Sequence, residues 1–169
     1  MRNEVLERLT GDHARFERFF RAIEEQCARL DAGKPADVPR LKAIVSYLAK
    51  FAFPRHHALE DAIFAQLVKR MPNFWVEIFD LPEDHHTSKQ EFMNFMLAVE
   101  RGDDDLADTA RSFVANERGH FISEEEIVFR YARKHLTADQ WAELREGLRI
   151  IESEDGHPQN VDLIADLLA

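Results

Sequence analysis

The stretch FPRHHALEDAIF, residues 53–64, places two adjacent histidines and an acidic pair inside a segment that is otherwise mostly apolar. His56 and Glu60 are four residues apart, so on a helix they share one face. His57 and Asp61 are spaced in the same way. Either pair is compatible with a polar surface or with a metal site, and the rest of the chain has to distinguish the two.

The composition is that of an acidic, folded domain. The chain has 169 residues and 45% hydrophobic residues, which predicts a single domain over residues 1–169 with a sizeable core. Lys and Arg number 22 against 32 Asp and Glu; the net charge of −10 argues against nucleic acid or an anionic membrane as the main partner. There is no apolar run long enough to span a bilayer, and the charged N-terminus lacks a signal-peptide pattern. With a single cysteine, Cys27, the sequence predicts a cytoplasmic protein.

Apolar residues recur at helical spacing in five segments that are separated by turn-forming residues. The expected helices span residues 3–30, 38–70, from after Pro82 to 100, from after a turn at 101–105 to 135, and 137–153. Pro54 is expected to kink or split the second helix because proline has no backbone N–H. Four long helices joined by short turns predict an all-α fold, an antiparallel four-helix bundle with an additional C-terminal helix.

Two segments fall outside this helical pattern. Residues 71–82 form an aromatic-rich connector with room for a short helix, and a short apolar segment follows at 161–168. Phe74 and Trp75 in the connector either cover one end of the bundle or form the contact of a homodimer.

Each of the four main helices carries a histidine on its apolar face. These residues are His13, His56, His85 and His120. On the third helix, His85 lies in a more apolar register than its neighbour His86, so His85 is the preferred inward residue. Glu60 and Glu124 each follow a histidine by one turn on the same face. A single histidine on an apolar face is usually a hydrogen-bonded core residue, but four of them in one bundle favour a shared role.

A metal site explains this pattern. Burying several neutral imidazoles and two carboxylates without partners costs on the order of 2–7 kcal/mol for each unsatisfied group. Coordination to a cation satisfies the nitrogens and oxygens and keeps the carboxylates ionised. Imidazole and carboxylate ligands without a thiolate favour iron, manganese or zinc. Since two carboxylates are placed to bridge, we expect a pair of metals about 3.5–4 Å apart.

The chain resembles the hemerythrin-like proteins with an HHE cation-binding domain. The resemblance covers residues 3–152, which form the expected domain core. The motifs that carry it, in order, are LTGDHARF around His13, HHALEDAIF at 56–64, a histidine in EDHH, HFISEEEIVF at 120–129, and LTADQW after them. Two H-x-x-x-E pairs fall on the second and fourth helices, as they do in the family.

The resemblance implies an up-down four-helix bundle that encloses a non-haem di-iron centre. It places metal ligands at His13, His56, Glu60, His120 and Glu124, with the two glutamates bridging the irons. It adds His57 as a further ligand, and a third-helix ligand that is His85 or His86. Hemerythrins that carry oxygen have a second histidine one turn later on this helix. Here that residue is Lys89, which argues against reversible oxygen carriage.

A ferritin-like di-iron site is the rival interpretation. Such sites use E-x-x-H pairs, and the chain contains Glu83-x-x-His86 and Glu117-x-x-His120. This interpretation ranks lower because Glu83 follows a proline at a helix start and the first helix offers His13 in place of a glutamate. Asp61, Glu125 and Glu126 are interpreted as solvated groups or as partners that orient ligand imidazoles.

Three functions are compatible with such a centre. The favoured one is a protein that binds dioxygen or a related diatomic molecule such as nitric oxide, for sensing, storage or scavenging. The alternatives are an enzyme that reacts with peroxide or oxygen, and an iron-sensing or structural metal protein. The sequence shows neither a nucleophile paired with a base nor a phosphate-binding glycine loop, so we assign no catalytic residue.

Overall fold

All regular structure in the described part of the chain is helical. The computed structural model describes residues 3–73 and 81–153. Its helices are α1 (Glu4–Asp31), α2 (Val38–Tyr47), α3 (Phe53–Arg70), α5 (Leu81–Arg101), α6 (Leu106–Ser123), α7 (Phe129–His135) and α8 (Ala138–Ser153). The π-helical segments η1 (Leu48–Ala52) and η2 (Glu124–Val128) join α2 to α3 and α6 to α7. The expected all-α class is confirmed; residues 74–80, with Phe74 and Trp75, and the segment at 161–168 lie outside the described residues.

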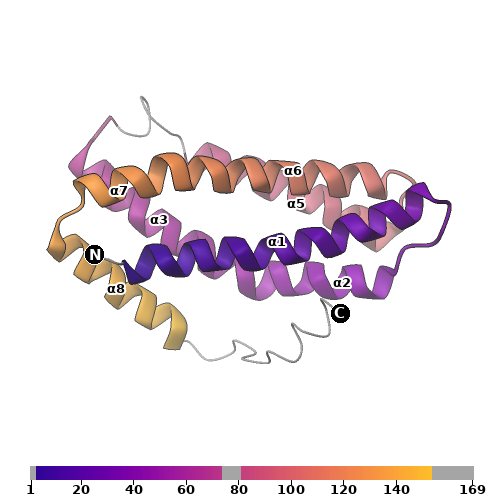
Figure 1. Cartoon of the computed structure of the whole chain (residues 1–169), viewed down its shortest axis with the longest axis horizontal. Coiled ribbons are helices and arrows are strands. Elements are labelled where there is room, and N and C mark those ends of the chain that lie inside the picture. Colours follow the sequence, from indigo (N-terminus) through magenta and orange to yellow (C-terminus); the bar gives the residue numbers. More distant parts are fainter. Residues whose placement is uncertain (1–2, 74–80, 154–169) are drawn as a thin grey trace.

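The long helices lie side by side along the length of the molecule, and α8 lies across one end (Figure 1). Helix α1 packs against α6 and α3, while α5 packs against α6 and α2. Helix α8 contacts α1 and α3 at the end where α1 begins. The arrangement is a helical bundle in which α8 covers part of one end.

Side-chain caps set several helix ends. Asn3 Oδ1 accepts hydrogen bonds from the N–H groups of Val5 and Leu6 at the start of α1. At the start of α8, the Thr137 N–H donates to Gln140 Oε1 (3.0 Å) and the Gln140 N–H donates to Thr137 Oγ1 (3.3 Å). This reciprocal pair is the capping box that the sequence predicts there.

Asp37 caps α2, and its removal should cost measurable stability. Its carboxylate accepts a hydrogen bond from the Arg40 N–H (3.0 Å). We expect Asp37→Ala to lower the free energy of unfolding by about 1 kcal/mol, because an N–H in the first turn of α2 loses its acceptor. Urea denaturation of the metal-free protein measures this change. Asp37→Asn is the control and should stay close to wild type; an equal loss in both variants would contradict the capping role.

Two of the long helical segments contain a π turn, η1 between α2 and α3 and η2 between α6 and α7. Pro54 splits the expected helix 38–70 as predicted, and in η1 the Phe53 N–H donates to the Leu48 carbonyl five residues earlier. The sequence predicts a continuous fourth helix that ends at residue 135, but η2 interrupts it. There the Phe129 N–H donates to the Glu124 carbonyl. The sequence of η2 has no proline or glycine to indicate this change. Since a π turn widens the helix by one residue, η2 changes which side chains follow Glu124 toward the interior.

The buried side chains form two apolar clusters with a polar layer between them. The larger cluster contains Phe16, Phe20, Phe53, Phe95, Phe113 and Phe121, together with Cys27, which is a core residue as expected. The smaller contains Leu9, Leu59, Ile63, Val128 and Phe129 and continues to α8. The polar layer comprises His13, His56, Glu60, His120 and Glu124, all of them buried. Helices α1 and α3 contribute side chains to both clusters, on either side of the layer, while α6 contributes to the larger cluster and η2 to the smaller.

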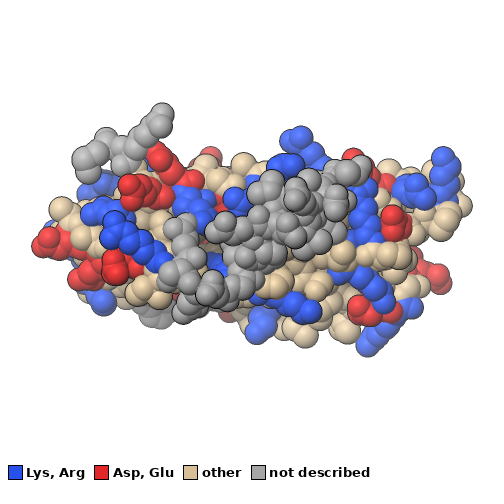
Figure 2. All heavy atoms as spheres, turned by 90° about the horizontal axis from the view of Figure 1, so that it is seen from below, with Lys and Arg blue, Asp and Glu red and all other residues tan. Residues whose placement is uncertain are grey.

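The surface mixes charges of both signs. Lys and Arg side chains are interspersed with Asp and Glu along the face shown in Figure 2, so in the described part of this face the acidic excess is not gathered in one field. Within the ranges that the structure describes, none of the helices combines the length and the apolarity needed to cross a membrane.

Candidate metal centre

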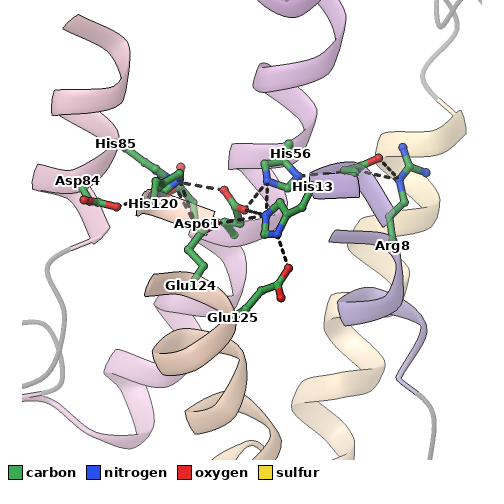
Figure 3. A network of polar contacts seen from close by, with 11 residues as sticks. Arg8, His13, His56, Asp61, Asp84, His85, His120, Glu124 and Glu125 are labelled. Atoms are coloured by element: carbon green, nitrogen blue, oxygen red, sulfur yellow. Dashed lines mark hydrogen bonds and ion pairs between the residues drawn. The ribbon is translucent and has the colours of Figure 1, made fainter. Parts of the chain in front are cut away.

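Two groups of potential metal ligands meet inside the bundle. One comprises His13, His56, Glu60 and Glu124, and the other comprises His57, Glu60, His85 and His120. Within each group, one donor atom from every residue lies within 4.8 Å of the others. The side chains come from α1, α3, α5, α6 and η2, and Figure 3 shows the labelled imidazoles pointing toward a common region beside Glu124. The structure therefore brings together seven of the eight residues that the sequence singles out.

Each of the two glutamates spans both groups. Glu60 Oε1 lies 2.6 Å from His56 Nε2, while its Oε2 lies 3.3 Å from His85 Nε2. Glu124 Oε2 lies 3.4 Å from His13 Nε2, while its Oε1 lies 3.6 Å from His120 Nε2. One oxygen of each carboxylate thus addresses the His13 and His56 side, and the other oxygen addresses the His85 and His120 side. This is the arrangement that bridging carboxylates have between two cations.

The distance between the Nε2 atoms of His13 and His56 also fits the binding of both rings to one metal ion. His13 Nδ1 donates to Glu125 Oε1 at 2.8 Å, because a carboxylate can only accept, so Nε2 of the neutral ring carries the lone pair. His56 Nε2 lies 3.1 Å from this atom. Two nitrogens bound to one metal at right angles, with bonds of about 2.1 Å, lie about 3 Å apart. In the metal-free protein the two nitrogens are at hydrogen-bond distance, and the same separation would let both bind one cation.

The centre contains buried polar atoms that need a partner. Both oxygens of Glu60 and of Glu124 are fully buried and form no hydrogen bond of regular geometry with the described residues. The same holds in that part of the chain for Nε2 of His57, His85 and His120. Such atoms cost about 1–3 kcal/mol each when they are left unsatisfied. Nitrogen and carboxylate oxygen are good ligands for iron, manganese or zinc, so the donor set fits a metal pair.

The pKa values of the two glutamates move apart in the metal-free protein. Burial raises the pKa of Glu124 well above its usual value, and the nearby charge of Glu60 raises it further. Burial acts on Glu60 in the same direction, but the attraction of His56, together with His13 and His85, outweighs it and holds the pKa of Glu60 well below its usual value. Glu60 therefore ionises more readily than Glu124.

The pKa values of His56, His57 and His85 are shifted in the metal-free protein. Burial lowers the pKa of His56, but the negative charges of Glu60 and Asp12 outweigh it and raise this pKa to about 9. For His85, burial is outweighed in the same way by Asp61 and Glu60, which raise its pKa to about 9. Burial lowers the pKa of His57 to about 3, against a weaker attraction by Glu60. Protons on His56 and His85 thus balance the buried negative charge, and metal binding would release them.

A carboxylate faces the outer nitrogen of each of four histidines. The predicted partners are confirmed for Asp61, whose Oδ1 lies 3.2 Å from His85 Nδ1, and for Glu125 beside His13. Glu126, the third predicted partner, is exposed. Sequence reasoning missed Asp12, which lies 3.6 Å from His56 Nδ1, and Asp84, which contacts His120 Nδ1. Both precede a ligand histidine directly, so the helical turn of about 100° aims them at the histidine of a neighbouring helix.

His86 stands apart from both groups. It follows His85 by one position on α5, and this rotation leaves its ring exposed; Lys89 is exposed as well. The ferritin-like alternative loses its first pair with this observation, since Glu83 is also exposed. Glu117 is buried, and burial raises its pKa, but it belongs to neither ligand group in the described part of the chain.

The chain matches none of the protein-family models, curated proteins and solved structures with which it was compared. The function therefore has to be argued from the geometry of the centre itself.

Proposed function

We propose that this chain is a hemerythrin-like, antiparallel up-down four-helix bundle that holds two iron ions and binds dioxygen or another small diatomic molecule. The proposal rests on the position of Glu60 and Glu124, each of which has one carboxylate oxygen near the histidines of one ligand group and the other oxygen near those of the second group. A single ion would use one oxygen of each carboxylate and would leave the imidazoles of the other group unsatisfied. Two ions use all of them.

The two metal positions receive unequal numbers of protein ligands. His57 supplies a third imidazole to the group of His85 and His120. The other group has only the imidazoles of His13 and His56. With both carboxylates shared, five protein ligands would hold one ion and four would hold the other. The position with fewer ligands is the one that keeps room for a small molecule.

Aromatic rings enclose this more open position. Phe121 stacks on the ring of His13 with centroids 4.1 Å apart. Phe129 also stacks on the His13 ring, with centroids 5.8 Å apart. Phe16 meets the His56 ring edge to face at 5.0 Å. These side chains exclude water and admit a small apolar molecule more readily than a charged one. An apolar lining of this kind suits a diatomic ligand.

A pair of ferrous ions supplies an open coordination position and electrons for a bound diatomic molecule. Iron fits better than zinc, because zinc sites of proteins are mostly four-coordinate, and five protein ligands exceed that number. Glu60 and Glu124 would keep the two ions together and neutralise their charge. The outer carboxylates would hold the imidazoles in their binding tautomer.

The test is a visible spectrum of protein loaded anaerobically with ferrous iron. We expect two irons per chain by elemental analysis and a charge-transfer band that appears on exposure to oxygen. His56→Ala should lose the band, while His86→Ala, which removes an exposed ring on α5, should keep it. Protein that holds two irons and shows no band would contradict the binding function. Steady peroxide consumption that is lost in His56→Ala would assign the centre to an enzyme instead.

A further inference from the structure

Four carboxylates surround the ligand histidines, but they differ greatly in their exposure to water. The exposed side-chain fractions are 62% for Asp61, 44% for Glu125 and 34% for Asp84. Asp12 is different, with only 8% of its side chain exposed. Since water screens charges at the surface, Asp12 is the least screened of the four carboxylates, although it lies 3.6 Å from His56 Nδ1.

Two arginines hold Asp12 in place. Arg8 Nε donates to both carboxylate oxygens, at 3.2 and 3.0 Å, and Arg15 Nη1 donates to Oδ1 at 2.8 Å. All three residues lie on α1, one turn apart, whereas His56 lies on α3. Figure 3 shows this chain of contacts running from Arg8 inward to His56. Asp12 is therefore held on a neighbouring helix with its carboxylate 3.6 Å from the outer nitrogen of His56, a buried atom without a hydrogen bond in the described part of the chain.

We infer that Asp12, backed by Arg8 and Arg15, is the residue that positions His56 and tunes the iron held by His13 and His56. This inference rests on the proposed function. With the Nδ1 proton of His56 directed toward Asp12, its Nε2 lone pair points at the metal position, 2.6 Å from Glu60 Oε1. The negative charge makes the imidazole a stronger electron donor, which favours the ferric state of that ion.

The structure predicts a position-specific effect. Asp12→Asn should weaken iron at the His13 and His56 position about 10–100-fold, the range for loss of an orienting partner of a metal ligand. It should also raise the reduction potential of that iron. Asp61→Asn is the comparison on the other side of the centre, since it removes a carboxylate from His85; it should weaken only the other position, and by less than Asp12→Asn, because water screens the exposed Asp61.

The experiment titrates the full chain with ferrous iron under anaerobic conditions against a competing chelator and resolves two binding steps. His13→Ala and His57→Ala assign the steps, because each residue belongs to one ligand group only. Redox titration of the loaded protein then gives the potential of each iron. A purely structural role for Asp12 would weaken both steps alike and would leave both potentials unchanged. Arg8→Gln combined with Arg15→Gln serves in case Asp12→Asn fails to fold: it keeps the carboxylate charge but removes the groups that hold Asp12 in place, so it should weaken the same step without raising the potential of that iron.

The outcomes separate the two proposals. Selective weakening of one step, with a raised potential for the same iron, supports the positioning role. Two irons bound equally well by wild type and by Asp12→Asn overturn this inference and leave the proposed function intact. An effect of Asp61→Asn as large as that of Asp12→Asn also overturns it, because burial would then not matter. Wild-type protein that binds no iron overturns the proposed function, and the inference with it.

Discussion

Glu60→Ala should leave the chain unable to hold either metal ion. Glu60 belongs to both ligand groups, and its two oxygens face His56 and His85 from the same carboxylate. Its removal takes a ligand from each position and the negative charge from between them, so we expect the iron content to fall from two per chain to near zero. His57→Ala, by contrast, affects one group only and should leave about one iron.

Thermal melting gives an independent measurement of this loss. A ligand that binds only the folded chain stabilises it by about 2.7 kcal/mol at a concentration of one hundred times its dissociation constant. Iron should therefore raise the melting temperature of wild type and leave that of Glu60→Ala unchanged. Glu126→Ala is the control, because Glu126 is exposed in η2 and should behave as wild type. Retention of two irons by Glu60→Ala would refute the bridging role.

The histidines that face the interior of the bundle could be predicted, because the spacing of residues along a helix determines which side chains share a face. The apolar residues that follow two and three turns later, Phe92 and Phe95, favour His85 over His86, and the structure places His85 near Glu60 and His86 in solvent. The pairing of His56 with Glu60 follows from the same rule. A helix turns by a constant angle for each residue, so these predictions need no knowledge of the neighbouring helices.

Contacts between helices could not be predicted in this way. Asp12 acts on His56 of another helix, and Asp84 acts on His120, so the position of these carboxylates depends on how the helices pack. The π turn η2 escapes prediction because no local residue requires it. Pro54 does indicate a break in its helix, since a residue without an N–H cannot continue the ordinary hydrogen-bond pattern.

Phe113→Ala should destabilise the fold far more than the loss of a helix cap does. The Phe113 ring is fully buried at the centre of the larger cluster and contacts several others at centroid distances of 5.3–5.7 Å, those of Phe20, Phe92 and Phe95. Truncation removes these contacts and leaves a cavity between helices, which costs about 3–5 kcal/mol for a buried phenylalanine. In a domain of this size that corresponds to a fall of roughly 6–20 °C in melting temperature.

The measurement is thermal melting of the metal-free protein, with Phe51→Ala as the matched control. Phe51 packs against the same cluster from η1 but is only half-buried, so its truncation lets water replace the lost ring and should cost less than half as much. Equal losses in the two variants would show that the cluster is not centred on Phe113. Below its melting temperature, Phe113→Ala should still bind two irons, because no ligand of either group lies in the larger cluster. Loss of iron from the folded variant would mean that this apolar cluster and the polar layer act as one unit.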